Sequence, residues 1–392
     1  MPNPRVVLII SLVAALAGTG MAKAQTNFNQ FNLVSDGAVT AVITDPNLVN
    51  AWGISESPMS PFWISDNGTG LATLYSVPGS PPPAPVSVVP LVVTIPPATG
   101  ATTSAPTGQV FNSVGGFDLK NGNGQPAIFM FASEDGAITG WNGGTKAVIA
   151  VDNGNADPSK NAVYKGLAIS NFGGGSLYAT NFRADQVETY SSSGFSLVNT
   201  STDPGVPAGY APFGDRVING ELYVTFALQD SFKHDDVKGL GNGFVDIFNL
   251  DGSFNRRLIS QGNLDSPWGL ALAPASFGDF GGDLLVGNFG NGMINAYNPD
   301  TGAFIGTLNG ADGNPLSIDG LWGLTFGNGA AGGNLDTLYF TAGPNGENDG
   351  LFGALTPVPE PSTWAMMGLG FATLGLAGYR RARKARLAPT TV

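Results

Sequence analysis

Short apolar segments recur along the chain in a fixed order, and they predict a repeated all-β unit. The first segment pairs an aromatic residue with a glycine, the second resembles Leu-Tyr-x-Thr, and the third ends in an aromatic residue. Helical periodicity is almost absent, which leaves strands as the main element. Each segment occurs six times, so we predict six structural repeats.

The predicted strands fall into three sets of six, with a fourth strand between repeats. The first segments lie at residues 52–54, 117–119, 166–168, 213–214, 268–270 and 322–324. The second segments lie at 62–65, 128–132, 177–180, 222–225, 284–287 and 338–341. The third segments lie at 73–75, 138–141, 187–190, 245–248, 294–297 and 351–355. Fourth strands are expected at 86–95, 147–151, 196–199, 254–259 and 303–308.

The last repeat lacks a fourth strand of its own. Residues 28–34, which precede the first repeat, are free to supply it by pairing with residues 351–355. Such a closure removes the exposed sheet edge, as a propeller requires. The expected fold is therefore an all-β, six-bladed β-propeller closed by an N-terminal strand, spanning residues 25–356.

The glycine after the aromatic residue has a physical role in this arrangement. First strands crowd around the propeller axis, and a missing side chain lets neighbouring backbones approach. We expect the aromatic side chains themselves to wedge between blades.

The two ends of the chain have a different composition from the repeats. Arg5, the apolar run 6–16 and the small residues Ala22 and Ala24 have the layout of a secretory signal peptide over residues 1–24. We therefore expect export through the inner membrane and cleavage by signal peptidase, so that the mature protein begins near Gln25.

The C-terminal tail contains the most specific motif of the chain. Pro359, Glu360 and Pro361 precede an uncharged segment, 363–379, and then five basic residues between 380 and 386. This order resembles the PEP-CTERM sorting signal of Gram-negative bacteria, over residues 357–386. The resemblance implies a transmembrane helix near residues 363–380, recognition by an exosortase, and release to the cell surface or medium. An ordinary tail anchor is the alternative.

The charge of the remaining chain narrows the possible partners. Without the seven basic residues of the two ends, ten basic residues face 29 acidic ones, a net charge of −19. Such a surface repels nucleic acid and favours association with cations. The chain has no cysteine, which excludes thiol chemistry and disulfides.

Several segments between the two ends carry a second resemblance. They are residues 45–53, 65–70, 177–183, 233–237, 241–246 and 339–345. Through them the chain resembles a family of exported bacterial propellers that often have PEP-CTERM tails. The resemblance implies the fold and export, and it brings no activity or catalytic residues with it.

Oxygen-bearing side chains follow the second strand of every repeat, where loops gather on one face of a propeller. Such side chains on converging loops can bind Ca²⁺ or another divalent cation, although the same residue types also make tight turns. One loop, residues 227–243, is longer than the others and carries four of the candidates, including the only histidine. The candidate ligand or metal residues are Asp66, Asn67, Glu134, Asn181, Asp230, His234, Asp235, Asp236, Asn288 and Asn345.

The acidic residues of the long loop repel one another unless a cation neutralises them. Lys233, Lys238 and Arg183 are the basic candidates, and we expect salt bridges because the spacing matches no known Ca²⁺ loop. A single histidine also excludes a histidine dyad, and no nucleophile elbow, P-loop or H-E-x-x-H motif is present.

Two functions remain open at this stage. The favoured one is a surface or matrix protein whose propeller binds an extracellular polysaccharide or protein. The alternative is a lactonase-like, metal-dependent hydrolase that uses Asp66, Glu134, Asn181 and Asn288 around the channel. Both are compatible with a propeller, and the ligand, catalysis and oligomeric state stay open.

Overall fold

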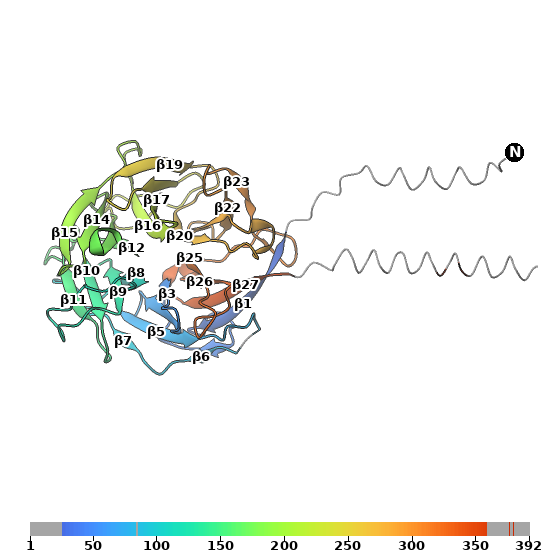
Figure 1. Cartoon of the computed structure of the whole chain (residues 1–392), viewed down its shortest axis with the longest axis horizontal. Coiled ribbons are helices and arrows are strands. Elements are labelled where there is room, and N and C mark those ends of the chain that lie inside the picture. The colour runs from blue at the N-terminus through green and yellow to red at the C-terminus, as the bar shows by residue number, and fades with distance from the viewer. Residues whose placement is uncertain (1–25, 84, 359–375, 377–378, 380–392) are drawn as a thin grey trace, which may run out of the picture.

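The computed structural model describes residues 26–83, 85–358, 376 and 379. Six antiparallel sheets are arranged in a circle, each with its first strand next to the central axis (Figure 1). The first strands of neighbouring blades contact one another all the way round, from the first blade to the sixth and back. The predicted six-bladed, all-β propeller is confirmed.

The blades are numbered here in chain order. Blade one has β3 (Ala51–Ser55), β4 (Phe62–Asp66), β5 (Leu71–Ser76), β6 (Ser87–Val88) and β7 (Val93–Thr94). Blade two has β8 (Pro106–Phe111), β9 (Phe129–Ser133), β10 (Ala137–Trp141) and β11 (Val148–Asp152). Blade three has β12 (Tyr164–Ser170), β13 (Ser176–Asn181), β14 (Gln186–Ser191) and β15 (Ser196–Ser201). Blade four has β16 (Tyr210–Ile218), β17 (Glu221–Leu228), β18 (Phe244–Phe248) and β19 (Phe254–Ser260).

Blade five has β20 (Pro267–Leu272), β21 (Leu284–Asn288), β22 (Ile294–Tyr297) and β23 (Phe304–Thr307). Blade six has β25 (Leu321–Phe326), β26 (Leu338–Ala342), β27 (Leu351–Pro357) and β1 (Asn27–Ser35), with β2 (Ile43–Thr44) and β24 (Asn309–Gly310) beside β1. Short helical turns lie at η1 (Pro158–Lys160), η2 (Phe172–Gly174), η3 (Gly278–Phe280) and α2 (Pro344–Glu347).

Blade six is closed by the N-terminal strand, as predicted. β1 pairs antiparallel with β27, from Phe28 opposite Pro357 to Ser35 opposite Leu351. Phe28 is fully buried, and its ring lies 4.8 Å from that of Phe277 on blade five. Hydrogen bonding across the sheet and burial of apolar side chains together join the two ends of the ring.

The first strands approach one another as closely as their glycines allow. A Cβ atom on Gly53 would lie 2.2 Å from the carbonyl oxygen of Thr107, and one on Gly214 would lie 2.2 Å from that of Trp268. Any larger residue would therefore push neighbouring blades apart. The structure confirms the predicted role of the repeated glycine.

One first strand was predicted at the wrong place. We expected it at Phe117–Leu119, but the first strand of blade two is β8, and Phe117 lies in the loop that follows it. β8 contains Gly108 without an aromatic residue before it, because Thr107 holds that position. The glycine, rather than the aromatic residue, therefore marks the first strand.

The aromatic residues of the first strands pack against those of neighbouring blades, as we expected, and they do so close to the axis. Trp52 stacks on Trp322 with ring centroids 3.6 Å apart, and Phe289 stacks on the other side of Trp322 at 3.8 Å. Phe182, Phe213 and Trp268 complete this cluster, which we call the aromatic plug. Since these rings come from several blades, the plug closes the channel with apolar contacts.

The predicted signal peptide and most of the predicted tail helix, residues 363–380, lie outside the described residues. Within the part of the chain that the structure describes, no helix has the length and apolar character needed to cross a membrane.

Candidate functional site at the channel mouth

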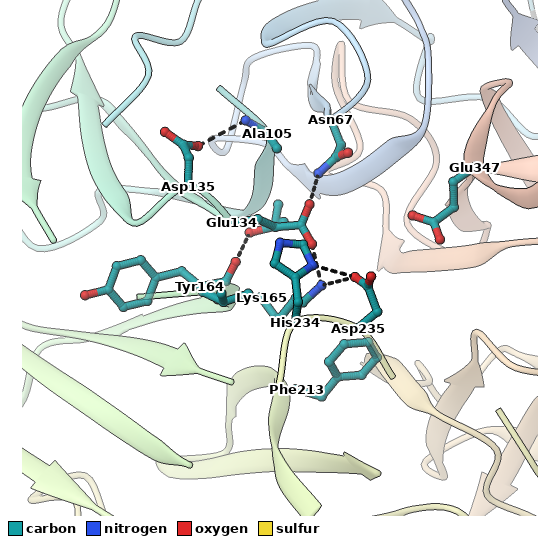
Figure 2. Close-up of polar contacts among 12 residues, drawn as sticks. Asn67, Ala105, Glu134, Asp135, Tyr164, Lys165, Phe213, His234, Asp235 and Glu347 are labelled. Atoms are coloured by element: carbon teal, nitrogen blue, oxygen red, sulfur yellow. Dashed lines mark hydrogen bonds and ion pairs between the residues drawn. The ribbon is translucent and has the colours of Figure 1, made fainter. Parts of the chain in front are cut away.

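The loops between second and third strands meet on one face of the propeller, above the aromatic plug. Figure 2 shows side chains from several of these loops pointing toward one another. The contacts are made by Asn50, Asn67, Glu134, Lys165, His234, Asp235 and Glu347, which we call the mouth network.

Lys165 is the centre of the mouth network. It belongs to β12 near the start of the strand, and only 2% of its side chain is exposed. Its ammonium group donates to Glu134 and lies 3.5 Å from Asp235 (Figure 2). It also lies 5.1 Å from the ring centroid of Trp52, on top of the aromatic plug. The structure thus places one cation on the axis, between carboxylates and aromatic faces.

The ion pairs keep this buried lysine charged. Burial alone would lower the pKa of Lys165, but Glu134 and then Asp235 outweigh it, so the pKa lies above its ordinary value. The hydrogen bond from His234, at 2.8 Å, is the main reason why the pKa of Asp235 falls to about 2. At neutral pH Asp235 is therefore ionised and forms an ion pair with the ammonium group of Lys165.

Amide side chains extend the network to blades one and six. Asn67 donates to Glu134 at 2.9 Å, and Asn50 donates to Glu347 at 2.9 Å. Asn50 is fixed in turn by the indole of Trp322, which donates to it at 2.9 Å. Burial, together with the neighbouring Glu134, raises the pKa of Glu347. A positive group that enters the mouth would favour the ionised form of Glu347.

Of the predicted residues, four lie in the mouth network: Asn67, Glu134, His234 and Asp235. Asp230 instead shapes the long loop, because its carboxylate accepts the backbone N–H groups of Phe232, His234 and Asp235. Burial raises the pKa of Asp236 on the same loop. Asn345 is exposed on the loop between β26 and β27.

Three other candidates make hydrogen bonds outside the mouth network. Asp66 is fully buried within blade one and accepts from Thr73 at 3.2 Å. Asn181 donates to the buried Glu188 at 2.8 Å, and Asn288 accepts the backbone N–H of Asp265 at 3.0 Å. Of the four residues of the lactonase-like alternative, Glu134 is the one that makes contacts in the mouth network.

The salt bridges of the mouth involve a different base from those we predicted. Arg183 donates to the carbonyls of Pro158 and Asn161, and Lys238 lies over the ring of Phe289 at 4.0 Å. No ion pair of Lys233 with an acidic side chain is found among the described residues. Lys165 takes this role, from 31 and 70 positions away in the sequence. A single lysine in a β-strand carries no local signal for such a pairing.

Three groups of the mouth have a separation that a metal ion could bridge. Ligand atoms of Glu134, His234 and Asp235 all lie within 4.8 Å of one another. Lys165, however, bonds to two of these three residues. Its ammonium supplies the positive charge that a divalent cation would otherwise supply.

Comparisons with known proteins find a motif in the C-terminal tail and relatives that cover most of the chain. Residues 357–384 match the PEP-CTERM protein-sorting motif. Uncharacterized protein R648 of Acanthamoeba polyphaga mimivirus is 31% identical over 344 residues, which cover 86% of this chain and 82% of that protein. Uncharacterized protein L690 of the same virus is 30% identical over 331 residues, which cover 82% of this chain and 84% of that protein.

Among solved structures, one titled "Streptogramin B lyase structure" is 10% identical, with a TM-score of 0.46. The match covers 86% of this chain and all of that one. R648 and L690 are viral proteins, whereas the resemblance implied a family of bacterial ones. The chain belongs to the family of the mimivirus proteins R648 and L690, and it carries a PEP-CTERM protein-sorting motif at its C-terminal end.

Proposed function

We propose that the protein is an exported binding module whose channel mouth recognises a positively charged group on an extracellular partner. The observation that carries the proposal is the excess of carboxylates around Lys165. Glu134, Asp235 and Glu347 face one buried ammonium, so the mouth is acidic when they are ionised. Since these charges are partly buried, screening by salt weakens them less than exposed ones.

The long loop adds an apolar surface beside this charge. Phe232 is 80% exposed and Leu240 is 73% exposed, and both belong to the loop that carries His234 and Asp235. Exposed aromatic side chains are typical anchors of binding surfaces. A lysine or arginine side chain of a partner protein, or an amino sugar of a polysaccharide, has the matching combination of charge and apolar surface.

The export part of the proposal is supported by the tail motif and by the N-terminal sequence. The sorting motif supports recognition by an exosortase, with membrane anchoring before release. Residues 1–24 have the layout of a signal peptide. On this proposal the propeller works at the cell surface or in the matrix.

Binding of the cationic peptide tetralysine to the purified exported protein tests this role of the mouth. Asp235→Asn combined with Glu347→Gln should weaken binding at least about fivefold, on the order of 1 kcal/mol. Asp118→Asn combined with Asp300→Asn makes the same change in net charge at exposed residues of other loops. That control should change affinity less than about twofold. Equal losses in both pairs would mean that general attraction explains the binding, and would refute a site at the mouth.

A divalent-metal hydrolase is the second candidate, favoured by the close ligand atoms of Glu134, His234 and Asp235. A metal held there could activate water. It would have to displace Lys165 from its carboxylate partners first. The two candidates therefore differ in whether the folded protein responds to Ca²⁺.

A further inference from the structure

A second chamber lies at the other end of the channel, below the aromatic plug. It is a cavity of about 270 Å³, lined by the first strands of all six blades. Four of the plug residues, Trp52, Phe213, Trp268 and Trp322, belong to these strands, and the cavity residues follow them along the chain. We call this chamber the far cavity. It is separate from the mouth network and shares no side chain with it.

The far cavity contains an unusual number of polar atoms without partners. In the part of the chain that the structure describes, the buried unpartnered oxygens of its lining are Ser55 Oγ, Glu56 Oε2, Gln109 Oε1 and both carboxylate oxygens of Asp215. Buried polar atoms are normally hydrogen-bonded. Groups that donate hydrogen bonds would satisfy all of these oxygens.

The residue after the repeated glycine of the first strand is polar in only two of the six blades. In each first strand one residue follows the repeated glycine, and in four blades it is Ile54, Leu167, Leu270 or Leu324. Blades two and four have Gln109 and Asp215 instead. The amide group of Gln109 donates to the carbonyls of Gly53 and Trp63, whereas Asp215 has no hydrogen-bond partner among the described residues. A leucine would fill the same space without an unpartnered carboxyl group, so packing alone does not account for Asp215.

The charges of the cavity oppose each other. Arg216 donates to the carbonyls of Leu270 and Leu324, at 2.9 and 2.7 Å, and to Thr325. Thr325 donates in turn to Glu56. Burial raises the pKa of Glu56 to about 7 and that of Asp215 well above its usual range. The lining therefore holds one guanidinium group beside two carboxyl groups that burial favours in the neutral form, and a metal cation has no advantage there.

We propose that the far cavity binds a neutral, polyhydroxylated molecule the size of a single sugar residue. Hydroxyl groups both donate and accept, which suits unpartnered oxygens beside a guanidinium group. The aliphatic wall, with Phe111 and Trp268, suits the carbon faces of a sugar ring. The volume lies just below the range of about 300–1,000 Å³ typical of sites for drug-sized ligands, which limits the occupant to a smaller molecule.

Ligand-observed NMR with D-glucose, D-galactose and D-mannose tests the proposal on the purified exported protein. At least one sugar should bind, and Asp215→Leu should weaken its binding at least about tenfold. The same variant should keep or raise the melting temperature, because it replaces an unpartnered buried carboxyl group with the residue type found in other blades. It should also keep the binding of tetralysine at the mouth. Asp300→Asn, on an exposed loop, should leave sugar binding unchanged.

Three results would overturn the proposal. The first is that none of the three sugars binds. The second is that the wild type and Asp215→Leu bind a sugar equally well, since the site would then lie elsewhere. The third is that acetate, putrescine or Ca²⁺ binds in the far cavity in place of any sugar, since the cavity would then select charge. Failure of tetralysine binding at the mouth would leave the proposal for the far cavity intact, because the two tests use different residues.

Discussion

Lys165 carries the electrostatics of the channel mouth at the scale of a single residue. An isolated buried ammonium is costly, but Glu134 and Asp235 bond to it and aromatic rings lie beneath it. Sequence reasoning found the acids, because they occur on loops with turn-forming residues. It missed the base, because ion pairs between blades depend on the closed ring and have no local pattern.

Glu56 is a titratable residue whose effect on stability has a predictable sign. Its pKa is about 7 in the fold, above the ordinary 4.5, mainly because of burial. The folded state therefore holds this proton more tightly than the unfolded state. The stabilising contribution of protonated Glu56 is complete below pH 4.5, and it is lost as the pH rises through about 7.

Urea unfolding at pH 5 and pH 8 tests this sign. From pH 5 to pH 8, the free energy of unfolding of the wild type should fall by on the order of 1–3 kcal/mol relative to that of Glu56→Gln. Gln109→Leu changes the same cavity without changing a titratable group, and its difference from the wild type should be independent of pH. If the wild type instead became more stable relative to Glu56→Gln between pH 5 and pH 8, the raised pKa of Glu56 would be contradicted.

At the scale of elements, the β1–β27 pair holds the ring closed. The pairing runs from Phe28 to Ser35, and β24 pairs with the N-terminal end of β1. The closure could be predicted because one repeat had only three strands, while a spare apolar segment remained at the other end. The first strand of blade two could not be placed by an aromatic residue, since Thr107 stands where blades one, four, five and six have Trp or Phe.

Removal of the Phe28 ring should weaken this closure. Phe28 is fully buried against Phe277 and Phe280. Phe28→Ala should cost about 3–5 kcal/mol in the free energy of unfolding, measured with urea. The exposed Phe232→Ala should change it by less than about 0.5 kcal/mol. Similar free energies of unfolding for the two variants would show that the stability of the propeller does not depend on this closure.

At the scale of the whole molecule, one channel has two chemically different ends. The mouth has acidic groups around a lysine, the far cavity has opposed charges and unpartnered oxygens, and the aromatic plug separates them. The repeat pattern predicted the face on which the mouth lies. It did not predict the far cavity, because Gln109 and Asp215 differ from the other blades only at single positions.

The sorting motif gives a second prediction at this scale. Alanine in place of Pro359, Glu360 and Pro361 should leave the protein in the membrane fraction, because the sequence proposed for recognition is removed. Fractionation of cells followed by immunoblotting measures this. Pro81→Ala with Pro83→Ala, at exposed positions of a propeller loop, should be released as the wild type is. Normal release of the triple variant would exclude sorting through this motif.

The dependence of the melting temperature on Ca²⁺ tests most directly whether Lys165 is the cation of the mouth. The wild type should shift by less than about 1 °C in millimolar Ca²⁺, because the ammonium already neutralises the carboxylates. Lys165→Met should melt lower, since it leaves the acids unpaired, and Ca²⁺ should raise its melting temperature by about 3 °C or more. A clear rise for the wild type, abolished by Asp235→Asn with Asp236→Asn, would contradict the account and favour a metal site.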